Sequence, residues 1–293
     1  MINYILAKND DIDRVAHFIA RVNNNEENHI GYCGTDSEEI KNSLIEDLTD
    51  MPFNESFIVG IEYGEIIGVI GFDADLEDNS AEIWGPFIEK SKWYIVMDLW
   101  NEMIKILPKK IETISLFMNS KNKNSLKLAC ELGFNKSSEQ VILTFNQEDK
   151  YKLKDISETE LSLNYYEDFR RLHDRVFPNT YYSGSEILDR LNEHRKVFID
   201  LEENKLTGYI YAEVNPEFGE GSIEFIAVES LERGKGIGKR LLTMALRWLF
   251  TFHSVESINL CVNVQNEGAI NLYKSIGFIE KYHLYHYDKR LFY

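Results

Sequence analysis

The sequence predicts a mixed α/β fold that is repeated along the chain. Residues 11–22 have apolar side chains at helical spacing, and residues 57–72 read as two strands around a turn. Two blocks of the first half recur in the second half at nearly the same distance. With 293 residues, of which 44% are hydrophobic, the chain is long enough for two packed domains. We therefore expect two similar domains, each with its own core.

The repeat is visible in two pairs of segments. Residues 57–61 align with residues 197–201 at an offset of 140, and residues 122–134 align with residues 266–278 at an offset of 144. The polar stretch 146–150 falls where the first copy ends and before the second begins. We place the division there and expect domains of residues 1–149 and 150–293.

The second copy can be followed element by element. A helix over residues 165–177 is stopped by Pro178, and Ser185 is placed to cap a second helix over residues 186–192. A glycine-rich turn follows the third strand of this copy. The other expected elements are, in chain order, a hairpin over residues 197–201 and 206–214, a strand over 223–228, a helix over 239–252, a strand over 258–264 and a helix over 267–276.

Composition excludes several classes of protein. The formal net charge is −17, so the average surface repels nucleic acid. The same negative charge either attracts cationic small molecules or basic peptides, or only keeps the protein soluble. The three cysteines have neither disulfide-like nor zinc-like spacing. No apolar run is long enough for a membrane helix, and acidic residues interrupt the N-terminal segment. We expect a soluble, cytoplasmic protein with no membrane and no nucleic-acid partner.

The glycine-rich turn over residues 233–240 joins a strand to a helix, so its amides converge where the helix dipole favours an anion. A nucleotide P-loop is excluded by the spacing, since three residues separate Gly234 from Gly238 and Arg240 follows Lys239. The dinucleotide fingerprint GxGxxG does not match either. A turn without a ligand is hard to reconcile with four basic residues among eight in an acidic protein.

Two motifs resemble those of the GNAT superfamily of acyl-CoA-dependent N-acyltransferases. Arg233, Gly236 and Gly238 match the family's loop. The downstream pattern is met in order by Asn266, Ala269, Leu272-Tyr273 and Gly277-Phe278. The resemblance implies two tandem GNAT-like domains, each with a mixed, mostly antiparallel sheet flanked by helices, and the tandem arrangement resembles that of the mycothiol synthases.

The resemblance also implies acetyl transfer from acetyl-CoA, as co-substrate, to a primary amine of a small molecule or peptide by direct attack. Backbone amides from Ile237 to Arg240 are expected to bind the pyrophosphate, and the strand over residues 223–228 the pantetheine arm. The residues assigned to acetyl-CoA are Ile226, Ala227, Val228, Arg233, Gly234, Lys235, Gly236, Ile237, Gly238, Lys239, Arg240, Asn266 and Ala269.

The chemistry calls for a base and an acid. A lysine-like amine at pH 7 must lose a proton before it attacks, at a cost of roughly 4.6 kcal/mol. Glu224, on the strand that leads into the loop, is the leading base; a polar residue on the outer face or an ion-pair partner is the alternative. Tyr273 is at the family's general-acid position and would protonate the departing thiolate, whereas a packed core tyrosine is the alternative.

The first copy has lost these features. At the offset of 140, Gly236 and Gly238 fall on Val96 and Asp98, and Arg233 falls on Trp93. At the offset of 144, Tyr273 falls on Ala129, which has no proton to donate. Residues 1–149 are therefore expected to be a degenerate domain without a cofactor loop.

Two further expectations complete the sequence-based picture. His283 and His286 lie among tyrosines without acidic or cysteine partners at ligand spacing, so an aromatic terminal strand and no metal are expected. A non-catalytic acyl-CoA-binding sensor or interaction protein is the alternative function. The acceptor amine and the choice between monomer and homodimer stay open.

Overall fold

The computed structural model describes residues 1–291 and divides into two compact units. Unit 1 runs from Met1 to Gln140 and includes the chain from Tyr282 onward, and unit 2 runs from Val141 to Lys281. These limits differ from the division at residue 150 in two places. Residues 141–149 go with unit 2, and the C-terminal strand goes with unit 1.

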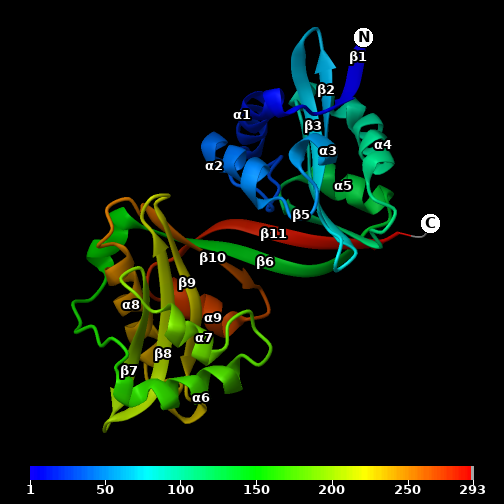
Figure 1. Ribbon diagram of the computed structural model, residues 1–293. Coiled ribbons are helices and arrows are strands. Elements are labelled where there is room, and N and C mark those ends of the chain that lie inside the picture. Colours follow the sequence, from blue (N-terminus) through cyan, green and yellow to red (C-terminus); the bar gives the residue numbers. More distant parts are fainter. Residues whose placement is uncertain (292–293) are drawn as a thin grey trace. The chain divides into compact units, whose positions relative to one another are not determined.

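Unit 1 is a mostly antiparallel sheet flanked by helices (Figure 1). Its strands follow the order β1-β2-β3-β4-β5-β11-β6; the boundary between the units falls within β6 and β11, so residues 135–140 and 282–290 of these strands belong to unit 1. The strands are β1 (Ile2–Leu6), β2 (Phe57–Glu62), β3 (Glu65–Asp75), β4 (Ser80–Ile88), β5 (Thr113–Asn119), β11 (Ile279–Arg290) and β6 (Asn135–Asn146). The helices are α1 (Ile12–Asn23), α2 (Ser37–Asn42), α3 (Phe53–Ser56), α4 (Val96–Ile106) and α5 (Lys123–Glu131), with shorter turns at Asn9–Asp11, Ser43–Asp47 and Lys90–Ile95.

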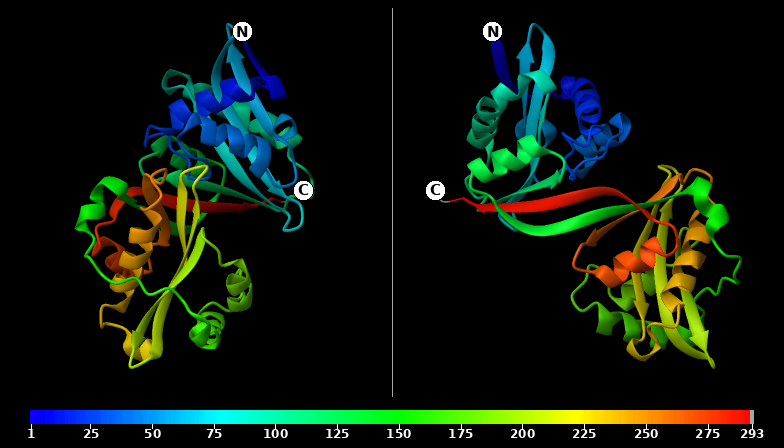
Figure 2. Two further views of the ribbon diagram at one scale, coloured as in Figure 1. Left: turned by 60° about the vertical axis from the view of Figure 1, so that its left-hand side comes forward. Right: turned by 180° about the vertical axis from the view of Figure 1, so that it is seen from behind.

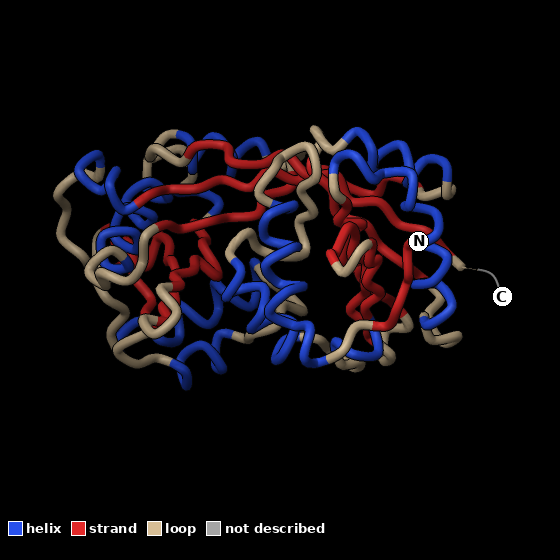
Figure 3. Tube along the Cα trace, turned by 90° about the horizontal axis from the view of Figure 1, so that it is seen from above, coloured by secondary structure: helices blue, strands red, loops and turns tan. Residues whose placement is uncertain are grey.

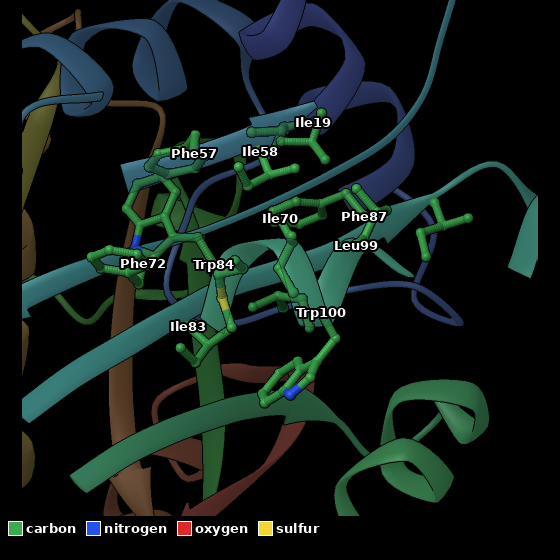
Figure 4. Packing of buried hydrophobic residues seen from close by; sticks show 14 of the residues in the cluster. Ile19, Phe57, Ile58, Ile70, Phe72, Ile83, Trp84, Phe87, Leu99 and Trp100 are labelled. Atoms are coloured by element: carbon green, nitrogen blue, oxygen red, sulfur yellow. The ribbon is translucent and has the colours of Figure 1, made fainter. Parts of the chain in front are cut away.

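The core of unit 1 lies between its sheet and its helices. Figure 4 labels Phe57, Phe72 and Trp84 from β2, β3 and β4, and Leu99 and Trp100 from α4, among the buried side chains of this core. Strand β3 is buried on both faces over residues 67–72, and α4 has a helical apolar stripe, so this part of the sheet packs against helices on both sides.

The C-terminal strand β11 completes the sheet of unit 1. It pairs antiparallel with β5 from Leu284 opposite Asn119 to Arg290 opposite Thr113. The side chain of His286 contacts the hydroxyl of Tyr32 through Nε2 and that of Ser137 through Nδ1, each at 2.9 Å. The expectation of an aromatic terminal strand is confirmed. Its neighbour was not predictable, because the alternation of side chains does not specify the partner strand.

Unit 2 contains a three-stranded antiparallel sheet, β7-β8-β9, and the paired strands β6 and β10. The β7-β8-β9 sheet has helices on both faces (Figure 2). The elements are α6 (Tyr166–Val176), α7 (Gly184–Arg190), β7 (Arg195–Glu202), β8 (Lys205–Asn215), β9 (Glu220–Val228), α8 (Ile237–Leu249), β10 (Ser257–Asn263) and α9 (Glu267–Lys274), with short turns at Gln147–Lys152, Leu163–Tyr165 and Ser230–Glu232.

Two separate cores hold the β7-β8-β9 sheet between its helices. Ile210 of β8 packs with Leu241 of α8, whereas Tyr209 of β8 packs with Phe169 of α6 on the opposite face. Figure 3 shows the helices in blue lying against the strands in red. The mixed, mostly antiparallel fold class predicted from the sequence is confirmed.

Two helix starts differ from the expected ones. Ser183, and not Ser185, caps α7: its hydroxyl accepts from the Glu186 N–H while the Glu186 carboxylate accepts from the Ser183 N–H, a reciprocal capping box. Helix α8 begins at Ile237, two residues before the expected start, because Gly236 turns the chain directly into the helix. No helix within residues 1–291 is long and apolar enough to cross a membrane.

Candidate functional site

The glycine loop connects β9 to α8 through two left-handed residues. Gly234 has φ +81° and Gly236 has φ +78°, and Gly236 is the residue that caps α8. A side chain at either position is strained by about 1–2 kcal/mol, since L-residues rarely adopt this backbone conformation. The sequence therefore needs glycine here for the shape of the loop.

The loop leaves helix amides free to bind an anion. The first intrahelical bond of α8 runs from the Arg240 N–H to the Gly236 carbonyl, at 3.1 Å. Within residues 1–291, the N–H groups of Ile237, Gly238 and Lys239 have no hydrogen-bond partner, and no side chain caps the helix. Three convergent donors at the positive end of a helix form an anion site. The Arg240 amide, expected among the pyrophosphate donors, is already bonded, and that expectation is corrected.

Most basic side chains of the loop are engaged with the protein. Lys239 Nζ donates to the Ser275 carbonyl at 2.6 Å. Lys235 lies between Glu232 and Glu202, and the hydrogen bond to Glu232 raises the pKa of the lysine most. The Arg240 guanidinium is bonded to Asp200.

Arg233 differs from its neighbours. It is exposed, and no ion pair or hydrogen bond of its side chain is found in the part of the chain that the structure describes. It is therefore the basic side chain of the loop that is available to a phosphate.

Helix α9 packs against the start of α8. A Cβ atom added at Gly238 would lie 3.0 Å from Leu272 Cδ2, so the glycine permits this close approach. Asn266 caps α9 by accepting from the Ala269 N–H at 3.2 Å. The glycine loop is thus brought next to the helix that contains Tyr273, and the two helices are seen side by side in the right-hand view of Figure 2.

Tyr273 is a buried ring with an unbonded hydroxyl. The residue is 8% exposed, and its ring packs against Phe278 with centroids 5.5 Å apart. Within residues 1–291 the hydroxyl has no hydrogen-bond partner, yet it is not among the fully buried unpaired atoms, so it reaches the surface. Burial raises the pKa of Tyr273, which keeps the phenol protonated. Tyr273 is thus a packed core residue through its ring, and its hydroxyl is still available as a proton donor.

Strand β9 has a free edge beside the loop. It pairs with β8 on one side; β10 lies beside the first part of β9, where Ile258 is next to Gly221, but within residues 1–291 it forms no ladder with β9. Ile226 and Val228 pack toward α8, and Ala227 is buried on the opposite face. A strand edge with unpaired N–H and C=O groups can bind an extended chain that contains amides, as the pantetheine arm does.

Glu224 is the extra residue of a bulge in β9. Tyr211 pairs with Phe225 and Ala212 pairs with Ile223, which leaves Glu224 without a partner in the ladder. Its carboxylate accepts a hydrogen bond of 2.5 Å from the hydroxyl of Tyr181, in the connection between α6 and α7. The ring of Tyr181 packs on Phe225. The bulge therefore turns Glu224 toward the α6–α7 connection, which alternation along the strand could not reveal.

The equivalent region of unit 1 has no anion site. Ile95 and Leu99 approach Gly68 where Ile237 and Leu241 approach Gly208. The start of α8 therefore aligns with the start of α4 at an offset of 142. For the glycine loop, this offset replaces the value of 140 used in the sequence comparison.

With this alignment Gly236 falls on Tyr94, Gly238 on Val96 and Arg240 on Asp98. No residue from 86 to 132 has a positive φ. Unit 1 thus lacks the loop in its backbone as well as in its sequence.

Sequence reasoning missed two residues of the site. Asp200 is an acidic residue at the end of an apolar strand, and Tyr181 is one of two adjacent tyrosines in a loop. Neither belongs to the motifs that identified the site. Only their contacts with Arg240 and Glu224 reveal them.

The geometry of unit 2 agrees with the comparisons. Residues 165–278 match the family described as "Acetyltransferase (GNAT) family". The chain contains a domain of the GNAT acetyltransferase family. This match lies within unit 2 and includes the glycine loop, Glu224 and Tyr273.

Named relatives match part of the chain. The chain is 31% identical over 116 residues to a spermidine N(1)-acetyltransferase of Vibrio cholerae, and 32% identical over 111 residues to an N-alpha-acetyltransferase of Sulfurisphaera tokodaii. These alignments cover 37% and 34% of this chain, and 66% of the length of each relative.

The whole chain resembles a solved tandem protein in fold. A tandem GNAT protein from the clavulanic acid biosynthesis pathway matches with a TM-score of 0.63 and 13% identity, over 99% of this chain and 98% of that chain. At this identity the match supports the two-domain architecture alone.

Proposed function

We propose that unit 2 is an N-acetyltransferase that transfers acetyl from acetyl-CoA to a primary amine of a small molecule or peptide. The observation that carries the proposal is the anion site at the start of α8, with its left-handed glycines, its free amides and the unpaired cation of Arg233. The pyrophosphate of acetyl-CoA has the charge and size for this site, and the pantetheine arm would lie along the free edge of β9.

Two side chains are proposed for proton transfer. Glu224 would accept a proton from the ammonium group of the acceptor, leaving a neutral amine. As the amine nitrogen bonds to the thioester carbon, the C–S bond breaks and the sulfur leaves as thiolate. Tyr273 would donate its phenolic proton to that sulfur, and the proton that the new amide nitrogen loses would return to the tyrosinate directly or through water. Amides of Ile226 to Val228 are the proposed donors to the thioester carbonyl oxygen.

The acceptor is proposed from relatives and charge. The two relatives are named as a spermidine N(1)-acetyltransferase and an N-alpha-acetyltransferase. Both kinds of substrate present an amine, and the net charge of −17 favours a cationic one. Unit 1, which lacks the loop, is proposed to bind no acetyl-CoA.

Calorimetry and a thiol-release assay test the proposal. The intact chain should bind one acetyl-CoA, and it should release free thiol when spermidine or peptides with free N-termini are added. Two equivalent sites would contradict the assignment to unit 2. Binding without thiol release for any amine in the panel would favour the acyl-CoA sensor.

A further inference from the structure

Arg240 is held by the protein at a place where a phosphate ligand was expected. Its Nε donates to Asp200 Oδ1 at 2.7 Å and its Nη2 donates to Oδ2 at 2.9 Å. The Asp200 side chain is 8% exposed and also accepts from Thr207 Oγ1 at 2.7 Å. A bidentate guanidinium on a buried carboxylate has a fixed orientation, because two parallel hydrogen bonds set both its plane and its distance.

The third guanidinium nitrogen reaches the glycine loop. Nη1 of Arg240 donates to the backbone carbonyl of Lys235 at 3.2 Å. A trans peptide is planar, so the N–H of Gly236 points in the direction opposite to this carbonyl. The Asp200–Arg240 ion pair therefore sets the orientation of the Lys235–Gly236 peptide group. It directs the Gly236 N–H away from the guanidinium group, immediately before the free amides of α8.

Unit 1 provides an internal comparison. Asp200 pairs with Gly208 beside an irregularity in the ladder, and Gly60 pairs with Gly68 beside the same irregularity in unit 1. The position of Asp200 is therefore occupied by Gly60.

The two residues that bond to Asp200 in unit 2 have no equivalents in unit 1 either. At the same offset Thr207 corresponds to Ile67, and the helix alignment places Asp98 at the position of Arg240. Asp98 accepts a hydrogen bond from Tyr4 at 2.9 Å. Unit 1, which has no glycine loop, therefore lacks equivalents of Asp200, Thr207 and Arg240. This arrangement accompanies the loop and is not a general feature of the fold.

We propose that Asp200 and Arg240 are positioning residues that orient the glycine loop for the pyrophosphate of acyl-CoA. They act through the Lys235 carbonyl and do not touch the ligand. The inference rests on the proposed function, since it concerns the same site.

Electrostatics and geometry predict opposite effects for Asp200→Asn. Removing a negative charge near an anion site strengthens anion binding if charge alone matters, and it frees Arg240 to contact phosphate. If the pair positions the loop, the same change weakens binding. We expect an affinity for coenzyme A lower by about tenfold or more, the effect of losing roughly one hydrogen bond to a charged group.

The matched control is Glu202→Gln. Glu202 is another carboxylate near the loop; its side chain is 57% exposed, and its Oε2 lies 3.3 Å from Lys235 Nζ. The substitution removes the same charge but no contact to the Lys235 carbonyl. The Glu202→Gln variant should bind coenzyme A with an affinity equal to or higher than that of the unmodified chain. Arg240→Lys keeps the cation but cannot bond both Asp200 and the carbonyl, so it should behave like Asp200→Asn.

The experiment is calorimetric titration of the full chain with coenzyme A, and ligand-detected NMR with pantetheine, which lacks the pyrophosphate. The inference requires that Asp200→Asn weaken coenzyme A and leave pantetheine unchanged. Unchanged or tighter coenzyme A binding overturns it, and so does an equal loss for both ligands, which would indicate general damage to the fold. If the unmodified chain does not bind coenzyme A, the proposed function fails and the inference fails with it.

Discussion

Removal of a single hydroxyl, by Tyr273→Phe, separates catalysis from stability in unit 2. The hydroxyl of Tyr273 makes no hydrogen bond within residues 1–291, so no bond is lost, and the ring contact with Phe278 remains. The free energy of unfolding should therefore change by less than about 0.5 kcal/mol. Turnover should fall by roughly 10²–10⁴-fold, because a positioned proton donor contributes about that much.

The assay follows thiol release at saturating acetyl-CoA and acceptor, and thermal unfolding reports stability. Tyr209→Phe is the matched control, since Tyr209 is a buried tyrosine of the same unit whose hydroxyl is 2.5 Å from His173 Nδ1. That change should cost about 1–3 kcal/mol of stability and leave kcat within a few-fold.

The pH dependence has a defined sign. Burial raises the pKa of Tyr273 above its ordinary value near 10. The acid is thus fully protonated at pH 7–9, and turnover should not decline there through loss of this proton. Normal turnover of Tyr273→Phe on a verified acceptor would refute the assignment and leave protonation of the thiolate to water.

Three further changes test other parts of the structure. Glu224→Gln should slow turnover most at low pH and least at high pH, where the acceptor amine is neutral without help; a pH-independent defect would reduce Glu224 to positioning the substrate. Gly236→Ala should strain the loop by about 1–2 kcal/mol and weaken coenzyme A binding. The control is Gly64→Ala, also at positive φ but in a turn of unit 1, which should lose similar stability and leave binding unchanged. Calorimetry with coenzyme A compares the two variants. Truncation after Lys281 removes the ladder on β5, so hydrogen exchange should accelerate in β5; unchanged protection would contradict the pairing.

The sequence alone determined the features that depend on local chemistry. The glycine-rich turn located the candidate anion site, because the left-handed residues Gly234 and Gly236 at a helix start need glycine whatever surrounds them. The cap at Asn266 and the hairpin of β7 and β8 were also readable, since their signals lie within a few residues. The loss of the loop in unit 1 followed from the absence of glycine between Gly85 and Gly133.

Tertiary structure decided what depends on partners far along the chain. Arg240 reads as a phosphate ligand until Asp200, 40 residues away, is seen to hold it. Glu224 is assigned to a face only by the bulge against β8, which no periodicity in β9 encodes. Strand β11 joins β5 of unit 1 although it follows unit 2 in sequence. In each case the physical reason is the same: a side chain or strand edge has several possible partners of equal chemistry, and only the folded backbone brings one of them within bonding distance.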